Sequence, residues 1–169
     1  PRGAGVTIAV IDPGIATGVA DLGDAVVGGA DFSGIGAPNG QQPVGSDGDE
    51  HGTLVAGLAA GRGTGPASGV IGAAPEASLL SLSIGFGEGT SSSDEQIARA
   101  VTWAVDHGAD VINMSLTRNT LDWPESWDEA FLHAMEHDVV VVAAAGNRAS
   151  GTVVVGAPAT MPGVLTVGG

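Results

Sequence analysis

The chain has 169 residues, of which 43% are hydrophobic, 29 are glycine and none is cysteine. That length suffices for one domain with a sizeable buried core, and the lack of cysteine excludes disulfides and thiol catalysis. The formal net charge of −14 argues against nucleic acid as a partner, because an acidic surface repels a phosphate backbone.

The first part of the chain predicts one strand and one helix. Residues 6–11 are apolar and rich in β-branched side chains, so we expect a buried strand that ends before Asp12. Residues 28–50 are rich in glycine, proline, aspartate and serine, and we expect a loop there. Small and apolar side chains then recur at helical spacing from His51 to Gly61, and residues 61–69 predict another loop.

The middle of the chain predicts a strand, a helix and a second strand. Residues 79–84 form an apolar run, and Ser93 follows with Gln96 three positions later, which fits a capping box at a helix start. Gly108 can terminate this helix, and residues 111–114 predict the next strand.

The last part repeats this alternation of helix and strand. Ser126 and Glu129 fit a second capping box. Three large apolar side chains should line that helix: Trp127, Phe131 and Met135. Residues 139–145 and 164–167 predict two more strands.

The predicted strands are almost uniformly apolar, so both of their faces should be covered. Apolar strands that alternate with helices are typical of a parallel sheet with helices on both sides. We therefore expect residues 1–169 to form a single α/β domain, with no internal repeat and no linker.

Polar side chains gather where the predicted strands end, and sites in α/β sheets lie at that edge. Asp12 follows the first strand, His51 begins a helix, residues 113–117 end the third strand and Asn147 follows the fourth. An acid, an imidazole and an amide donor could therefore meet at one edge of the sheet. Taken alone, Asp12 is more often a turn residue and His51 a residue that starts a helix. Asn147 could adopt a left-handed turn after Gly146, although we favour the amide donor, and Asn113 is best explained as structural.

Five segments resemble the motifs of the subtilisin-like serine proteases (subtilases), in that family's order: 8–14, 51–57, 111–116, 143–147 and 158–168. The resemblance implies a three-layer, subtilisin-like α/β fold, with the C-terminal part of the catalytic domain missing from this chain. It also implies a serine endopeptidase located outside the cell or in the cell envelope. Leu54 and the composition resemble the mycosin-like branch of the family.

The resemblance implies a role for each matching residue. His51 would be the general base, Asp12 would orient it, and Asn147 would donate a hydrogen bond to the oxyanion. The segment Ser115-Leu116-Thr117 would bind the polypeptide substrate along a strand edge, with residues 87–92 as the opposite wall.

The family's nucleophilic serine lies in a Gly-Thr-Ser-x-Ala segment after the asparagine, so we expect it beyond Gly169. Residues 89–91 read Gly-Thr-Ser but come too early, and we interpret them as helix capping. Pro13, Glu50 and Leu54 depart from the family pattern. Pro13 removes a backbone donor beside Asp12 and could change the orientation of its carboxylate.

Cofactors and metals have weaker signals. His133 and His137 are spaced i, i+4 but lack further ligands, so no metal is expected there. The acidic residues Asp47, Asp49 and Glu50 could bind calcium, although a solvated loop explains them better. We expect no cofactor.

Two other functions remain open at this point. The chain could be a non-catalytic subtilase-like fragment that acts as a binding or scaffold module. More remotely, residues 11–14 resemble the first motif of some RNase H-like nucleases, although the net charge of −14 opposes this. No apolar run reaches the roughly 18 residues of a membrane span, so none is expected in this segment.

Overall fold

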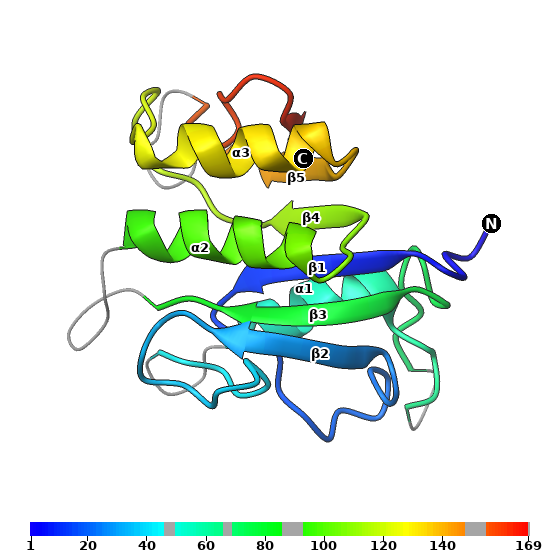
Figure 1. Ribbon diagram of the computed structural model, residues 1–169. Helices are drawn as coiled ribbons and strands as arrows, with labels where there is room; N and C mark the ends of the chain where they lie inside the picture. Colours follow the sequence, from blue (N-terminus) through cyan, green and yellow to red (C-terminus); the bar gives the residue numbers. More distant parts are fainter. Residues whose placement is uncertain (46–49, 66–68, 86–92, 148–154, 169) are drawn as a thin grey trace.

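A parallel sheet forms the centre of the computed structural model, which describes residues 1–45, 50–65, 69–85, 93–147 and 155–168 (Figure 1). Within these residues the sheet has six strands in the order β2-β3-β1-β4-β5-β6, and every neighbouring pair is parallel. The strands are β1 Thr7–Asp12, β2 Val26–Asp31, β3 Ser78–Ser83, β4 Val111–Met114, β5 Val140–Ala144 and β6 Leu165–Val167.

Helices lie on both faces of this sheet. Helix α1 (His51–Ala60) packs against β1 and β3 on one face, while α2 (Ser93–Asp106) and α3 (Ser126–Glu136) pack side by side on the other (Figure 1). The predicted three-layer α/β arrangement is confirmed. Alternation along β1 explains the two cores, because successive side chains of a strand point to opposite faces. Ile11 belongs to the core under α2 and α3, and Val10 belongs to the core under α1.

The predicted loop over residues 28–50 is wrong at its start, where β2 runs from Val26 to Asp31. This strand lies at the edge of the sheet and contains two glycines, so it carries little of the apolar signal of a buried strand. Gly29 has a φ of 159°, and a Cβ there would lie 2.1 Å from the carbonyl oxygen of Ser81. Close backbone approach therefore helps to hold β2 in the sheet, together with Val26 and Ala30, which pack against the two cores.

The other predicted strands and all three helices are confirmed, with ends that agree to within one residue. The second capping box is wrong: Glu125 is the N-cap of α3, and no side chain caps this end. In α2 the side chain of Gln96 is fully buried and exchanges two hydrogen bonds with the backbone of Gly85. Trp127 and Phe131 line α3 as expected, but Met135 is 42% exposed.

No helix in the part of the chain that the structure describes is both long enough and apolar enough to cross a membrane.

Candidate active site

Asp12 is the last residue of β1, at the carboxyl edge of the sheet. Asp12 is only 1% exposed. Its backbone oxygen accepts a hydrogen bond from the backbone N–H of Ile84, the residue after β3. Strand β3 pairs with β1 as far as Asp12, and β4 pairs with β1 as far as Val10, so the carboxylate projects from a supported strand end.

His51 is the first residue of α1, and its imidazole contacts Asp12. The Nδ1 atom lies 2.8 Å from Oδ1 and 3.0 Å from Oδ2 of the carboxylate. A carboxylate only accepts hydrogen bonds, so Nδ1 must carry a proton. In the neutral ring Nε2 then carries no proton. The His51 side chain is 54% exposed, whereas that of Asp12 is 1% exposed. One end of the pair is enclosed and the other reaches solvent, which suits a base that must meet a substrate.

Gly52 makes this contact possible. A Cβ at this position would lie 2.4 Å from the carbonyl oxygen of Gly14 and 2.9 Å from Oδ1 of Asp12. Only a residue without a side chain lets the start of α1 approach the end of β1 so closely.

Pro13 leaves the orientation of the carboxylate compatible with His51. Its carbonyl oxygen accepts a hydrogen bond from Val44, and both carboxylate oxygens of Asp12 still lie within 3.0 Å of the imidazole. The missing backbone donor at Pro13 therefore does not prevent the contact between Asp12 and His51.

The segment Ser115-Leu116-Thr117 follows β4 directly, at the same edge of the sheet as Asp12. Asn113 donates from Nδ2 to Oγ of Ser115, which ties the segment to its strand and gives Asn113 a structural role. Among the described residues, no backbone hydrogen bond is formed by Ser115, Leu116 or Thr117 outside the strand ladders. Within the described part of the chain, these three residues therefore leave backbone groups without a backbone partner.

Asn147 is exposed and lies three residues after β5. Strands β1, β4 and β5 are successive neighbours in a parallel sheet, so Asp12 at the end of β1 lies at the same edge as Ser115 and Asn147, which follow β4 and β5. The oxyanion role of Asn147 stays a prediction. Several sequence-predicted features lie outside the described residues, namely the substrate wall at 87–92, the Gly-Thr-Ser at 89–91, and Asp47 and Asp49 of the acidic cluster.

Sequence reasoning missed a cluster beside the predicted substrate segment. The guanidinium of Arg118 forms an ion pair with Asp94 at the start of α2, and it lies over the ring of Trp127, 5.5 Å from the centroid. An arginine directly after the substrate motif was the available signal, but its partners are distant in the chain.

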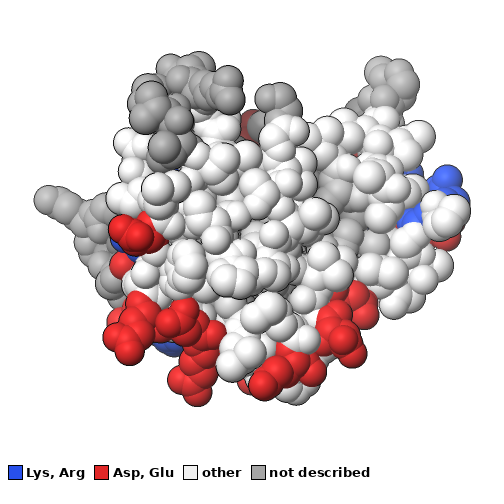
Figure 2. Space-filling model, turned by 90° about the horizontal axis from the view of Figure 1, so that it is seen from above, with Lys and Arg blue, Asp and Glu red and all other residues white. Residues whose placement is uncertain are grey.

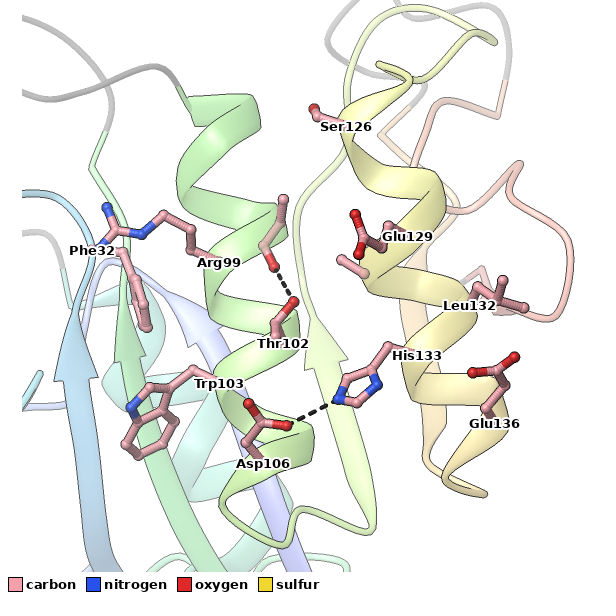
Figure 3. A pocket seen from close by; sticks show the side chains of 12 residues that line it. Phe32, Arg99, Thr102, Trp103, Asp106, Ser126, Glu129, Leu132, His133 and Glu136 are labelled. Carbon is pink, nitrogen blue, oxygen red and sulfur yellow. Dashed lines mark hydrogen bonds and ion pairs between the residues drawn. The ribbon is translucent and has the colours of Figure 1, made fainter.

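A groove of about 730 Å³ lies between α2 and α3, outside this edge (Figure 3). His133 and Asp106 bridge it through a contact of 2.9 Å between Nε2 and Oδ1. None of the predicted site residues lines this groove. In the described ranges no three His, Cys, Asp or Glu side chains lie close enough together to hold a metal ion.

The sequence of nearly the whole chain matches one known protein family. A model described as the subtilase family matches residues 3–169. The chain belongs to the subtilase family. The members of this family are proteases. The assignment of the chain to it therefore excludes the nuclease alternative.

Individual subtilases resemble the chain over nearly its whole length. It is 36% identical over 170 residues to the major intracellular serine protease of Bacillus subtilis (strain 168), covering 99% of this chain and 51% of that protein. It superimposes on fervidolysin from Fervidobacterium pennivorans, a keratinolytic enzyme related to subtilisin, with a TM-score of 0.76 and 31% identity, covering 98% of this chain and 24% of that one.

The protease MycP1, solved with its N-terminal propeptide removed, is also similar, with a TM-score of 0.65 and 36% identity over 86% of this chain and 44% of that one. The chain spans about half the length of the curated relatives it matches.

Proposed function

We propose that this chain supplies the acid and the base of an Asp-His-Ser triad in a serine endopeptidase. The contact between Asp12 and His51 carries the proposal, because two residues 39 positions apart meet in the geometry of an acid that orients a base. The nucleophilic serine is expected from a part of the protein that this sequence does not include.

The chemistry follows from the two nitrogen atoms of His51. Nε2 would take the proton of the serine during attack on the peptide carbonyl, and would later give it to the leaving amine. Asp12 would keep the proton on Nδ1 and stabilise the imidazolium that forms. Asn147 would donate its side-chain N–H to the developing oxyanion, a contact worth roughly 2.7–4 kcal/mol of barrier in other enzymes.

An extended polypeptide is the substrate that the strand edge fits. The segment after β4 is paired on one side, where the backbone N–H of Arg118 donates to the backbone oxygen of Ala157. Backbone groups of successive residues in a strand point to alternate sides, so those of Ser115 and Thr117 should face the other side. A peptide can pair there by adding a strand.

Two finer points stay predictions. Calcium binding near Asp47, Asp49 and Glu50 is a possibility with no support from the described residues, and no cofactor is expected. A location outside the cell or in the envelope follows the family resemblance, although the name of one relative places that relative inside the cell.

The test uses the full-length protein and a fluorophosphonate probe that labels an activated serine. We expect covalent labelling and cleavage of a casein substrate. Asp12→Asn should lower kcat by about 10⁴-fold, and His51→Ala by about 10⁶-fold. Asn147→Ala should lower kcat by about 10²–10³-fold.

His107→Ala is the matched control, because this exposed histidine stacks on Trp103 at the end of α2 and should leave activity unchanged. Absence of labelling in the folded wild-type protein would favour the non-catalytic module instead.

A further inference from the structure

Three side chains join the start of α2, the start of α3 and the segment after β4. Arg118 forms an ion pair with Asp94 and covers the indole of Trp127. The indole Nε1 in turn donates to the backbone oxygen of Asp94, at 2.9 Å. Trp127 is fully buried, whereas the side chains of Arg118 and Asp94 are 35% and 34% exposed. The ion pair therefore forms the outer layer over an apolar floor.

This cluster lies on one particular side of the predicted substrate segment. Side chains two residues apart in an extended segment share a face, so Leu116 and Arg118 point the same way. Leu116 is partly buried and packs against the core that contains Trp127. A peptide paired with the edge at Ser115 and Thr117 places every second side chain on this same face, next to Leu116.

We propose that the Asp94–Arg118 ion pair determines substrate specificity by covering the apolar floor of Leu116 and Trp127, so that large apolar side chains are excluded from it. The inference rests on the proposed function. The guanidinium occupies the space above the indole, and a bulky side chain can enter only by displacing a charge that is already paired. Small side chains at this substrate position fit without displacing it.

The experiment measures cleavage of a peptide library, varied one position at a time, by the full-length protein and three variants. Arg118→Ala removes the cover, and we expect kcat/KM for Phe or Leu relative to Ala to rise about tenfold or more at one position. The reason is that burial of a large apolar side chain contributes at least this factor. Asp94→Asn frees the guanidinium and should shift preference at the same position in the same direction.

Arg99→Ala is the matched control, since Arg99 also lies over an aromatic ring, that of Phe32, with its charge 5.6 Å from the centroid. It should leave the specificity profile unchanged. An unchanged profile in Arg118→Ala, a shift confined to charged substrate residues, or the same shift in Arg99→Ala would each overturn the inference.

A second measurement needs no catalytic activity. In a background that keeps Trp127 alone, with Trp103, Trp123 and any tryptophan outside this sequence changed to Phe, acrylamide should quench Trp127 fluorescence more strongly after Arg118→Ala. Unchanged quenching would show that the arginine is no cover, even in an active protease. Failure of the proposed function has a different signature, which is a wild-type protein that neither reacts with the fluorophosphonate probe nor cleaves any peptide.

Discussion

At the scale of single residues, Gly52 controls how closely His51 approaches Asp12. We expect Gly52→Ala to lower kcat/KM by at least 10²-fold, because the added Cβ would lie 2.4 Å from the oxygen of Gly14 and would push α1 away from Asp12. Gly57→Ala is the control in the same helix. Its Cβ would meet only Val70, at 3.9 Å, and should add about 0.5–1 kcal/mol of stability. Equal activity of both variants would contradict the argument.

Asp21 makes stability depend on pH. Backbone N–H groups of Val70 and Gly65 donate to its carboxylate and lower its pKa below 3.8. Because the pKa is lower in the folded state than in the unfolded state, the carboxylate stabilises the fold at any pH above its unfolded-state pKa. This stabilisation is lost as the pH falls through the folded-state pKa.

We therefore expect the difference in free energy of unfolding between wild type and Asp21→Asn to have its largest value at pH 6 and to decrease below about pH 3.8. Urea titrations at several pH values measure it. Asp24→Asn should change stability little at any pH, because the Asp24 side chain is 92% exposed and its ion pair with Arg62 lies at the surface. A gap that is constant from pH 6 to pH 2 would refute the role of Asp21.

The candidate site was predictable where chemistry and motif coincide in short segments. Asp12 and His51 each lie in such a segment, and the structure brings them into contact. Asp94 and Arg118 were not predictable, because an ion pair between residues 24 positions apart leaves no local pattern. The groups that we propose to act were thus visible in the sequence, while the groups that surround them depend on packing.

At the scale of elements, β2 is a strand held by its backbone. We expect Gly29→Ala to cost at least about 2 kcal/mol in free energy of unfolding, because its Cβ would overlap the carbonyl of Ser81 at 2.1 Å. Gly28→Ala should cost much less, since its Cβ would meet a flexible Leu80 methyl group at 3.3 Å. Denaturant titration of both variants compares them, and similar losses would contradict this account.

The same contrast explains which elements could be predicted. Strands β1, β3 and β4 lie inside the sheet and bury apolar side chains, so their sequences carry a strong signal. The edge strand β2 has half-buried residues and glycines, and its pairing depends on a neighbour some 50 positions away. The cap of α3 was misplaced because the helix begins without any side-chain cap, a choice that local patterns do not encode.

At the scale of the whole molecule, negative charge is unevenly spread. Acidic side chains gather along one margin in Figure 2, on the side of α2 and α3. Like charges at this density repel, and salt shortens the reach of the repulsion from about 10 Å at 0.1 M to about 3 Å at 1 M. We expect Tm of the full-length protein to rise between 0.02 M and 1 M NaCl. A falling Tm would contradict dominance of repulsion over ion pairs.

The parallel sheet also has a practical consequence. All strand ends that bear candidate chemistry lie on one rim, at the arrowheads in Figure 1, while the turn between α2 and β4 lies on the opposite rim. His107 is exposed in that turn, and the chain contains no cysteine. A thiol introduced as His107→Cys would therefore offer this chain a single anchoring point. Attachment to a bead or sensor there would leave the reactive rim directed outward, open to incoming molecules.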